Sequence, residues 1–367
     1  MKIAVDVSQL VYGTGVSSYL KNLVTNLLAI DKKNHYILFA GSLRSQSRLV
    51  SFFNQLVNTD NFQAKINFLS PNLANFLWNQ LHILPIEAIT GPVDVLLSSD
   101  WTQPPTLRAR TLTVVYDLIP WLYPETLSKK IINVHKKRMA WVKKEVSQII
   151  AISKNTKEDL GRIIGIAEEK ITVAYPGLDI NRFFPQNKVK VAQVKKKYHL
   201  DNYILGLGTQ EPRKNFKQVI AAFEKLNHHS LDLAIVGKYG WGEKINIKNK
   251  RIKTLGYVCD NDLASLYSGA SALVYPSLYE GFGLPIIEAQ ACGCPVITSK
   301  TSSMPEAAGK GAILVNPKST KEIFQSIKTV LVDLNIKKEL IERGKQNIKR
   351  FSWLKTAQTV LGTIENL

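Results

Sequence analysis

Short apolar runs alternate along the whole chain with longer stretches in which apolar residues recur every three or four positions. A short apolar run is typical of a buried parallel strand, whereas the longer periodicity is typical of an amphipathic helix. This alternation predicts a doubly wound parallel sheet in each half of the chain. The strands are predicted at residues 2–7, 36–40, 93–97, 111–115, 148–152 and 171–175, and then at 203–207, 233–236, 252–255, 272–275, 296–298 and 312–315.

The alternation of strands and helices is interrupted around Pro176 and Gly177. Proline and glycine with polar neighbours are typical of linkers, so we place a hinge near residues 176–186. A lysine-rich helix is predicted after it, from Lys188 to Tyr198. A chain of 367 residues is long enough for two domains, each with a full core. The expected fold class is therefore α/β, with two Rossmann-like domains.

One stretch in the second half, SLYEGFGLPIIEAQACGCP, carries the clearest chemistry. It follows a predicted strand, turns at glycines and continues from a proline that suits the first position of a helix. The backbone N–H groups of Phe282, Gly283 and Leu284 would lie at the positive end of that helix, which is an anion site. Glu280 precedes the turn and Glu288 lies about one turn inside the helix, so both can accept hydrogen bonds from hydroxyl groups beside the anion. A nucleotide sugar fits this arrangement.

Residues 13–18 follow the first predicted strand and open a helix, in a pattern close to the G-x-G-x-x-G of dinucleotide-binding proteins. In those proteins an acidic residue ends the second strand and binds the ribose. Here no acid follows the second strand, so a dehydrogenase is excluded. Gly13 and Gly15 can still face a donor diphosphate or an acceptor closely; the alternative is that the turn needs glycine for backbone reasons only.

Ligands of such sheets bind beyond the carboxyl ends of the strands, so the residues that follow each strand are candidates. Asp117 follows the fourth predicted strand and could accept a proton from an acceptor hydroxyl, or cap a turn beside Pro120. Ser153 follows the fifth strand. Capping of the next helix by Ser153 and Asn155, with Glu158 completing a capping box from Asn155, is favoured over catalysis.

Two basic residues, Arg213 and Lys214, follow the first strand of the second half and Gly208. Arginine supplies a bidentate donor and lysine a point charge, a combination that suits a diphosphate. Adjacent basic residues are usually solvated, but their position after a strand end favours phosphate binding.

Composition is that of a folded chain, with 45% hydrophobic and 21% charged residues, but the formal net charge is +19. Such a charge favours anionic partners: nucleotide phosphates, nucleic acid or an anionic membrane surface. Cys259, Cys292 and Cys294 are expected to be small core residues in a reducing compartment, because C-x-C without a nearby histidine is a poor zinc site.

No signal peptide or membrane span is predicted. The first strand begins at Lys2, and no apolar run approaches the ~20 residues that span a bilayer. We therefore expect a cytoplasmic protein, with at most a peripheral attachment to the inner face of the cell membrane. The only D-x-D, residues 260–262, directly precedes a helix and fits an N-cap better than a pair of magnesium ligands, so no metal is expected.

The spacing of Glu280 and Glu288 resembles the E-x7-E motif of the GT-B retaining glycosyltransferases of family 4 (glycosyl transferases group 1), a group with many mannosyltransferases. The resemblance covers nearly the whole chain and implies two facing Rossmann-like domains with an interdomain cleft. The acceptor-binding domain would span 1–178, with a C-terminal helix at 351–367 returning to it, and the nucleotide-sugar domain 179–350. Further segments match family blocks in order and spacing: Phe183, Gly208 to Asn215, Val236 to Trp241, Leu255 to Val258, Met304 to Gly309 and Phe351 to Trp353.

The resemblance implies transfer of a hexose from a nucleoside-diphosphate sugar to a hydroxyl of a glycan or lipid-linked glycan, with retention at the anomeric carbon and no cofactor. No second carboxylate is placed for a covalent intermediate, so we expect same-face attack, with the leaving phosphate taking the acceptor proton. The resemblance also implies which part of the donor each residue binds. Arg213 and Lys214 would bind the diphosphate, Glu280 the sugar hydroxyls and Glu288 the ribose. Main-chain groups of Tyr257 and Val258 would bind the nucleobase.

The family block that usually begins His-Asp begins with Tyr116 here, so the sugar contact of that histidine differs and the acceptor base is left open. The YEGFGLP and GKYGW segments look most like mannosyltransferases; GDP-mannose is the expected donor and a UDP-sugar the alternative. A non-catalytic polyanion binder would explain the charge but not Glu280 and Glu288, which would repel a phosphate-rich polymer. Nucleic acid is therefore not an expected partner. The other enzyme alternative, a pyridoxal-dependent GT-B phosphorylase, is not favoured, because no lysine of this sequence is identified as the one that would bind the cofactor.

The segment from Lys129 to Lys144 carries eight basic or imidazole side chains and no acid. Its lysines recur in pairs seven residues apart, so on a helix they form one stripe, while Ile132 and Met139 mark a separate core face. Val134 and Trp141 would lie at the edge of the lysine stripe, where an aromatic could enter a headgroup region. The expected partner is an anionic membrane surface; the alternative is a solvated lysine face.

Overall fold

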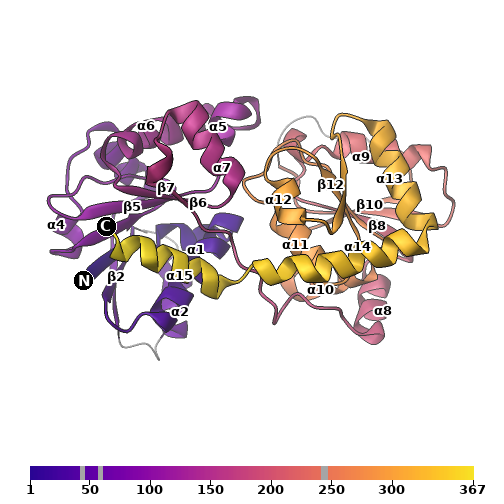
Figure 1. Cartoon of the computed structure of the whole chain (residues 1–367), viewed down its shortest axis with the longest axis horizontal. Helices are drawn as coiled ribbons and strands as arrows, with labels where there is room; N and C mark the ends of the chain where they lie inside the picture. The colour runs from indigo at the N-terminus through magenta and orange to yellow at the C-terminus, as the bar shows by residue number, and fades with distance from the viewer. Residues whose placement is uncertain (42–45, 57–60, 241–246) are drawn as a thin grey trace. The chain divides into compact units, whose positions relative to one another are not determined.

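The apolar runs of the sequence form two separate parallel sheets. The computed structural model describes residues 1–41, 46–56, 61–240 and 247–367, and within these the first sheet has seven strands in the order β3-β2-β1-β4-β5-β6-β7. The second sheet of the described chain has six, in the order β10-β9-β8-β11-β12-β13, and neighbouring strands are parallel in both (Figure 1). The predicted α/β class with doubly wound parallel sheets is confirmed.

Each sheet is the centre of its own compact unit. The N-terminal unit contains Met1–Gly177 together with Ser352–Leu367, and the C-terminal unit contains Leu178–Phe351. The chain therefore leaves the first unit, builds the whole of the second, and returns to the first for its last helix. These boundaries differ by one residue from the expected ones.

One strand of the first sheet, β3, is not among the predicted ones. Its sequence FQAKIN mixes apolar and polar residues, and most of its side chains are half-buried or exposed. β3 lies at the edge of the sheet, where a strand does not need a continuous apolar run. The strands of this sheet are β1 (Lys2–Asp6), β2 (His35–Gly41), β3 (Phe62–Asn67), β4 (Val95–Ser98), β5 (Arg110–Val115), β6 (Gln148–Ala151) and β7 (Ile171–Val173).

The helices of the N-terminal unit connect these strands. They are α1 (Gly15–Ile30), α2 (Gln46–Gln55), α3 (Pro71–Ala74), α4 (Glu87–Thr90), α5 (Ile119–Leu122), α6 (Lys129–Glu145), α7 (Lys154–Asp159) and α15 (Trp353–Glu365), with the short turns η1 (Ser8–Tyr12), η2 (Asn75–Gln80), η3 (Pro124–Thr126), η4 (Leu160–Ile164) and η5 (Glu168–Lys170).

The C-terminal unit repeats the pattern around the second sheet. Its strands are β8 (Asn202–Leu207), β9 (Leu231–Val236), β10 (Ile252–Gly256), β11 (Leu273–Tyr275), β12 (Val296–Ser299) and β13 (Ala312–Val315). Its helices are α8 (Lys188–Lys197), α9 (Phe216–Lys225), α10 (Asp260–Gly269), α11 (Leu284–Ala291), α12 (Met304–Ala308), α13 (Thr320–Val332) and α14 (Leu334–Asn347), with η6 (Pro212–Lys214) and η7 (Ile348–Arg350).

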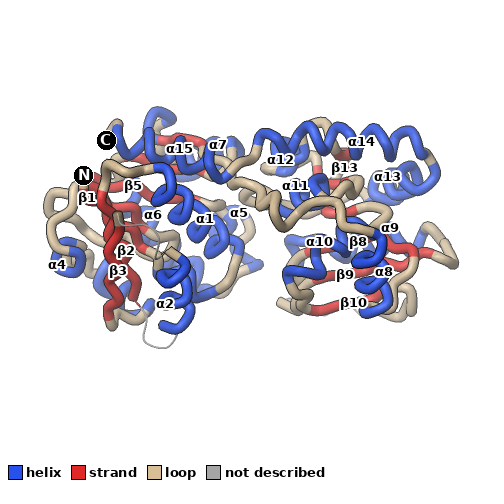
Figure 2. The backbone as a smooth tube through the Cα atoms, turned by 90° about the horizontal axis from the view of Figure 1, so that it is seen from below, coloured by secondary structure: helices blue, strands red, loops and turns tan. Residues whose placement is uncertain are grey.

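The strand order reverses once in each sheet, which fixes where a ligand can bind. Figure 2 shows β1, β2 and β3 side by side at one edge of the first sheet, and β8, β9 and β10 in the second. In the first sheet the reversal lies between β1 and β4, and in the second between β8 and β11. At such a point the two following connections leave on opposite faces of the sheet, so a crevice opens beyond the carboxyl ends of the strands. The residues after β8 and β11 are therefore the first place to look for a site.

The last helix packs against the first in the N-terminal unit. α15 lies along α1, and the two rings of Tyr19 and Trp353 meet edge to face with centroids 5.3 Å apart. The Tyr19 hydroxyl donates a hydrogen bond to the Ala174 carbonyl at 3.1 Å, after β7. Figure 1 shows the two helices side by side. This helix covers apolar surface that α1 would otherwise expose.

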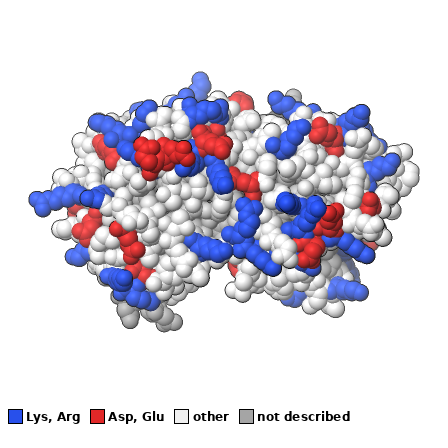
Figure 3. Space-filling model, in the orientation of Figure 1, with Lys and Arg blue, Asp and Glu red and all other residues white. Residues whose placement is uncertain are grey.

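Helix α6 presents its six lysines to solvent, as the seven-residue spacing predicts. Lys and Arg side chains gather over α6 at the upper left of Figure 3. The expectation for the edge of this stripe is wrong, because Val134 is buried and Trp141 is held within the unit. The Trp141 indole donates to the Asn79 carbonyl at 3.1 Å and stacks on the His82 ring with centroids 3.5 Å apart.

The predicted cap of α7 is only partly right. The Ser153 hydroxyl accepts a hydrogen bond from the Thr156 amide at 3.0 Å and is the N-cap. Asn155 therefore lies inside the helix, where its amide donates to Asp159 at 2.9 Å instead of forming a capping box with Glu158. Ser153 takes the cap because α7 begins at the next residue, Lys154, so that Ser153 reaches the first turn before Asn155 does.

The D-x-D segment differs from the expected N-cap. α10 begins at Asp260, so its N-cap residue is Cys259, which makes no side-chain capping hydrogen bond. Asp262 instead accepts hydrogen bonds from Lys197 at 2.6 Å and Tyr198 at 2.8 Å. Cys259 is exposed, so it is not a core residue, whereas the other two cysteines are buried.

Candidate active site

The reversal in the second sheet brings the segments after β8 and β11 together. The chain leaves β8 at Gly208, whose φ of 138° favours glycine and where an added Cβ would lie 3.0 Å from the Lys214 side chain. Glycine here therefore lets Lys214 cross the end of the strand. Asn215 then ties the two segments to each other, because its side-chain amide donates to the Pro276 carbonyl at 2.9 Å.

Glu280 lies between the two basic residues that the sequence singled out. Lys214 Nζ is 2.7 Å from Glu280 Oε1, and Arg213 Nη1 is 3.0 Å from Glu280 Oε2. The Tyr275 hydroxyl donates to Glu280 Oε1 at 2.8 Å and accepts from Lys214 at 3.0 Å. Arg213 also pairs with Glu211 and donates to the Tyr279 carbonyl at 2.6 Å. We call Glu211, Arg213, Lys214, Tyr275 and Glu280 the ion-pair network.

Burial and pairing act against each other in this network. Burial alone would raise the pKa of Glu280, but the charges of Lys214 and Arg213 outweigh it and lower the pKa to about 2. Burial lowers the pKa of Lys214, and Glu280 offsets only part of that effect. The pairing therefore stabilises the carboxylate more than the ammonium. The network holds two cations and two carboxylates, and its side chains are nearly inaccessible.

The turn after Glu280 is held by two serines that follow β12. The Ser303 hydroxyl donates to the Glu280 carbonyl at 2.8 Å and to the Phe282 carbonyl at 2.9 Å. The Ser302 hydroxyl donates to the Glu280 carbonyl at 2.8 Å and accepts from the Glu280 amide at 3.2 Å. Sequence reasoning missed both residues; the signal was the serine run between β12 and α12.

Helix α11 begins at Leu284, one residue before the Pro285 expected at its first position, with Gly283 at the N-cap. Gly283 has φ 105°, and no side chain caps the helix. The first-turn N–H groups of an α-helix have no intrahelical partners, so the start of α11 can bind an anion. Phe282 is buried against Phe351, with ring centroids 5.3 Å apart. This contact fixes the turn that leads from Glu280 into the helix.

Glu288 lies one turn inside α11 and is half-buried. It accepts a hydrogen bond from the Tyr267 hydroxyl at 2.9 Å. Tyr267 is fully buried in α10, and burial, followed by the nearby Glu288 charge, raises the pKa of its phenol. The phenol therefore stays protonated and orients the carboxylate.

The two candidate nucleobase residues follow β10. Tyr257 is exposed, and Lys238 Nζ lies 5.2 Å from the centroid of its ring. Val258 is buried, so it can offer its main chain but not its side chain. The GKYGW segment ends at Trp241, which lies outside the described residues.

The glycine turn of the N-terminal unit has the predicted place before α1. Gly13 has φ 63°, and Thr14 caps the helix in a capping box with Ser17. Gly15 is the first helical residue, and an added Cβ there would meet nothing within 4 Å. Backbone conformation explains glycine at position 13, but packing does not explain it at position 15.

The three candidates after β5 and β6 are already engaged. Tyr116 is buried and meets Tyr19 edge to face at 5.4 Å, and burial raises the pKa of its phenol. Asp117 is half-buried and accepts from the Ile119 amide at 3.0 Å, the turn-capping role that was the alternative. Ser153 is fully buried and donates to the Thr156 hydroxyl at 2.9 Å.

A buried charge cluster at the carboxyl ends of β1, β4 and β5 was missed. Arg138 of α6 is fully buried and lies 3.7 Å from the Asp100 carboxylate. Its guanidinium also donates to Ser99 O at 3.0 Å and Thr113 Oγ1 at 2.6 Å. Burial raises the pKa of Asp100 to about 6 although Arg138 opposes the shift, and burial also raises the pKa of Asp6. The sequence signal that could have revealed this cluster was a single arginine within a lysine-rich helix, together with acidic residues at or just after the carboxyl ends of strands.

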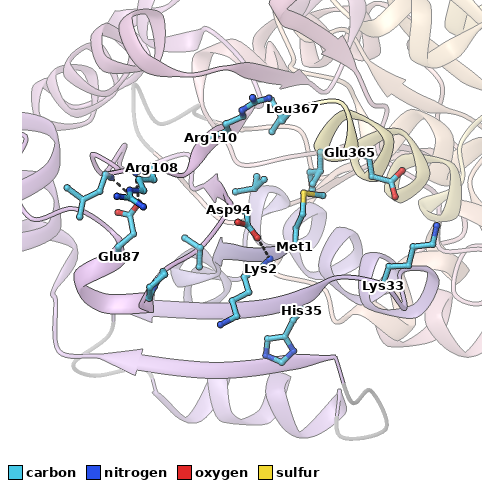
Figure 4. Close-up of a pocket in the computed structure, with 15 residues that line it drawn as sticks. Met1, Lys2, Lys33, His35, Glu87, Asp94, Arg108, Arg110, Glu365 and Leu367 are labelled. Carbon is cyan, nitrogen blue, oxygen red and sulfur yellow. Dashed lines mark hydrogen bonds between the residues drawn. The ribbon is translucent and has the colours of Figure 1, made fainter.

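A cavity of about 1060 Å³ lies at the edge of the first sheet where its strands begin (Figure 4). It is lined by residues at the amino ends of β1, β2, β4 and β5. Two of its acids are taken up by the main chain: Asp94 accepts from the Lys2 amide at 2.7 Å and Glu87 from the Leu107 amide at 2.9 Å. Because ligands of such sheets bind at the carboxyl ends, this cavity is not the candidate site.

The described part of the chain contains neither a membrane-spanning helix nor a group of metal ligands. None of its helices is both long and apolar enough to cross a bilayer. No group of three or more His, Cys, Asp or Glu side chains among the described residues could hold a metal ion.

Known proteins resemble the chain over most of its length. The family model of Glycosyltransferase Family 4 matches residues 13–182, and that of Glycosyl transferases group 1 matches residues 188–347. O-antigen chain mannosyltransferase B of Escherichia coli is 27% identical over 370 residues, 95% of each chain. O-antigen chain mannosyltransferase RfbU of Salmonella typhimurium strain LT2 is 33% identical over 234 residues, 62% of each chain.

Solved structures agree on the fold. Anabaena Alr3699/HepE, in complex with UDP and glucose, matches with a TM-score of 0.73 and 19% identity over all of both chains. WaaG, a glycosyltransferase involved in lipopolysaccharide biosynthesis, matches with a TM-score of 0.68 and 13% identity over 98% of each. With one family match in each unit and a parallel sheet at the centre of both, this chain belongs to glycosyltransferase family 4 and has the GT-B fold.

Proposed function

We propose that this glycosyltransferase moves mannose from GDP-mannose to a hydroxyl group of a glycan or lipid-linked glycan, with retention at the anomeric carbon. The observation that carries the proposal is the ion-pair network after β8 and β11. It puts two buried cations and a carboxylate beside the uncapped start of α11, all within the C-terminal unit. A diphosphate joined to a sugar is suited by this combination: cations and helix N–H groups for the phosphates, and a carboxylate for the sugar hydroxyls.

The cations serve the leaving group. Negative charge grows on the diphosphate as the bond from C1 of the sugar to the phosphate oxygen breaks, and Arg213 and Lys214 offset it together with the N–H groups at the start of α11. These groups are positioned before the donor binds, because Glu211 and Glu280 already hold both cations. Little reorganisation is then needed at the moment of reaction. We therefore expect turnover without added metal.

Glu280 binds the sugar but does not attack it. Both of its oxygens pair with cations, so it is a weak nucleophile that stays ionised and keeps lone pairs for sugar hydroxyls. We expect the acceptor oxygen to attack C1 on the face from which the diphosphate leaves. The acceptor proton passes to a phosphate oxygen as the old C1–O bond breaks and the new one forms, so configuration is retained.

The contacts to the ribose and the base of the donor are assigned to residues of the C-terminal unit. Glu288, oriented by Tyr267, holds the ribose hydroxyls, and main-chain groups of Tyr257 and Val258 hold the base. In the N-terminal unit, Gly15 is the glycine at which a ligand can approach closely. The alternative acceptor of the proton from the acceptor hydroxyl is the Asp117 carboxylate, which follows β5.

Mannose is proposed as the transferred sugar because two relatives are named as O-antigen chain mannosyltransferases. The runner-up donor is a UDP-sugar, since the Anabaena structure was solved with UDP and glucose. Pockets distinguish sugars that differ at one hydroxyl by only ~1–3 kcal/mol unless they bind that hydroxyl directly. The donor must therefore be measured.

A donor-hydrolysis panel tests the proposal. The purified full chain is given GDP-mannose, GDP-fucose, UDP-glucose, UDP-galactose and UDP-N-acetylglucosamine, with and without a chelator, and nucleoside diphosphate release is followed. The expected result is fastest release from GDP-mannose, unchanged by the chelator. Preference for a UDP-sugar would overturn the donor, and DNA binding tighter than any nucleotide with no turnover would favour the polyanion binder.

The mutant Lys214→Ala tests the network itself. Removing a donor aimed at developing charge typically lowers kcat by about 10²–10³-fold, whereas binding of free guanosine should change little because it carries no phosphate. Lys217→Ala in α9 is the matched control, since Lys217 is exposed three residues further on. An unchanged kcat in Lys214→Ala would remove the central argument.

We also propose that the enzyme works in the cytoplasm at the inner face of the cell membrane. The lysine face of α6 supplies six exposed positive charges, and each lysine near an anionic surface contributes ~1 kcal/mol. Attachment of this kind is reversible and weakens with salt. It would bring a lipid-linked acceptor to the N-terminal unit.

A further inference from the structure

The connection between β3 and α4 exposes an unusual concentration of large apolar side chains. Single exposed apolar residues are ordinary on a protein surface, but a cluster is a sign of an interaction site. The exposed fractions are 78% for Phe68, 44% for Leu73, 46% for Phe76, 49% for Leu81 and 50% for Ile83.

The fold of this connection does not need these side chains for its core. Ala74 and Trp78 turn inward and pack in the cluster that contains Ile86, and the Trp78 indole donates to the Leu84 carbonyl at 3.0 Å. Residues at helical spacing on the other face of α3 and η2, such as Phe76, are exposed. The segment is therefore amphipathic, with a second apolar face directed at solvent.

The connection lies along α6, the lysine-bearing helix. Near the start of α6, Lys130 Nζ donates to Asn72 Oδ1 at 2.8 Å. Further along, Trp141 donates to the Asn79 carbonyl, and at the end His82 lies 2.7 Å from Glu145. These three contacts follow one another along both segments. The connection from Asn72 to His82, which carries most of the exposed apolar residues, therefore runs along α6 from Lys130 to Glu145.

One row of lysines lies on the side of α6 nearest this connection. Lys137 is one helical turn from Trp141, and Lys144 Nζ lies 4.7 Å from the centroid of the Trp141 ring. Lys130, Lys137 and Lys144 recur every seven residues and so share a row. All three are exposed. A positive row therefore runs beside the connection that carries the exposed apolar side chains, which we call the apolar row.

We infer that these two rows form one docking surface for an anionic lipid bilayer. We call it the bilayer face: Phe68, Leu73, Phe76, Leu81 and Ile83 enter the boundary between headgroups and acyl chains, and Lys130, Lys137 and Lys144 pair with anionic headgroups. A charged row beside an apolar row is the composition of interfacial amphipathic segments. The inference deepens the proposed membrane location, and it names apolar anchors that lie outside α6. Trp141 is not an anchor because its ring is stacked on His82.

Vesicle sedimentation tests the bilayer face with the full chain. We expect binding to vesicles containing 30% phosphatidylglycerol, little binding to pure phosphatidylcholine, and partial release at high salt, because the apolar contacts are not screened. The double variant Leu73→Ser/Phe76→Ser should bind at least about tenfold more weakly at every salt concentration. Lys130→Glu/Lys137→Glu/Lys144→Glu should lose both the binding and its salt dependence.

The controls are matched in chemistry and lie in the C-terminal unit. Val332→Ser/Leu334→Ser removes two exposed apolar side chains, and Lys188→Glu/Lys190→Glu/Lys196→Glu reverses three exposed lysines. Both controls should bind vesicles within about twofold of the wild type. Donor hydrolysis should be the same in all four variants, which reports that they are folded. A wild type without hydrolysis but with vesicle binding would sink the proposed reaction and leave the bilayer face standing.

Depth of insertion is read from a fluorophore. Phe76→Cys in a Cys259→Ser background carries a polarity-sensitive dye, since the other two cysteines are buried. Its emission should shift to the blue with anionic vesicles, and the same dye at Leu334→Cys should not shift. Equal binding by Leu73→Ser/Phe76→Ser and wild type, or no shift at position 76, would overturn the inference. A shift only with an added acidic protein would reassign the surface to a protein partner.

Discussion

Glu280 is the residue on which the candidate site depends, because both of its oxygens hold a cation in place. The residue types were predictable: two glutamates around a glycine turn and two cations after a strand end are visible in the sequence. Their mutual pairing was not, because Lys214 and Glu280 are 66 residues apart and meet only through the order β8 next to β11. A carboxylate expected to face only ligand hydroxyls is also the internal partner of both cations.

The network predicts an acid limit of stability. The pKa of Glu280 is about 2 in the fold against an ordinary 4.5, so its contribution is present above about pH 5 and is lost as pH falls towards 2. The shift corresponds to about 3 kcal/mol for the C-terminal unit. Glu280→Gln should lower stability at pH 7 and flatten its dependence between pH 5 and 2 in urea unfolding. Glu224→Gln, an exposed glutamate of α9, should leave both unchanged. A wild-type slope in Glu280→Gln would contradict the assignment.

Helix α6 shows how far one element can be predicted. The seven-residue spacing placed the lysines on the outside, and Met139 and Val142 are in the core as the pattern requires. The spacing could not show that Arg138 points inward, because an arginine among lysines has the pattern of a surface residue. The acids whose charges offset its burial, Asp100 and Asp6, come from the loop after β4 and from β1. Such a contact depends on tertiary structure and not on periodicity.

Removing Arg138 should destabilise the N-terminal unit. Arg138→Met leaves Asp100 buried without its partner, which typically costs about 3–5 kcal/mol. Asp100→Asn in the same chain should recover part of the loss. Because burial already raises the pKa of Asp100 to about 6, the loss should be smaller at pH 5, where the carboxyl takes up a proton, than at pH 8. Thermal unfolding at the two pH values measures this, with the exposed neighbour Lys137→Met as control. An equal loss of stability in Arg138→Met at pH 5 and at pH 8 would refute the role of Asp100.

The whole molecule is two sheets and one returning helix. Apolar periodicity predicted twelve strands of the described chain and the break between the halves, because buried parallel strands are continuous apolar runs. It missed the edge strand β3, which mixes apolar and polar residues and has no fully buried residue. Assignment of the last helix to the first unit came from resemblance, since its amphipathic pattern alone does not say which surface it covers.

The returning helix should matter to one unit only. Val360 is fully buried in α15, and a carboxylate at this position would cost about 3 kcal/mol or more. Val360→Asp should lower protection from hydrogen exchange throughout the N-terminal unit and leave the strands of the C-terminal unit protected. Gln358→Asp, on the exposed side of α15, should change neither. Equal loss in both units would mean that they unfold as one.

The chain passes between the two units twice, after Gly177 and after Phe351, and these two points lie next to each other. Leu178 donates a backbone hydrogen bond to Phe351 at 3.4 Å, and a Cβ added to Gly177 would lie 2.1 Å from the Trp353 nitrogen. The C-terminal unit is thus an insertion whose two ends touch. An inserted cassette of this kind can be exchanged for that of another family member through one pair of neighbouring joints. On the proposed assignment of the donor to the C-terminal unit and the acceptor to the N-terminal unit, we expect such a graft to recombine the choice of sugar with the choice of acceptor.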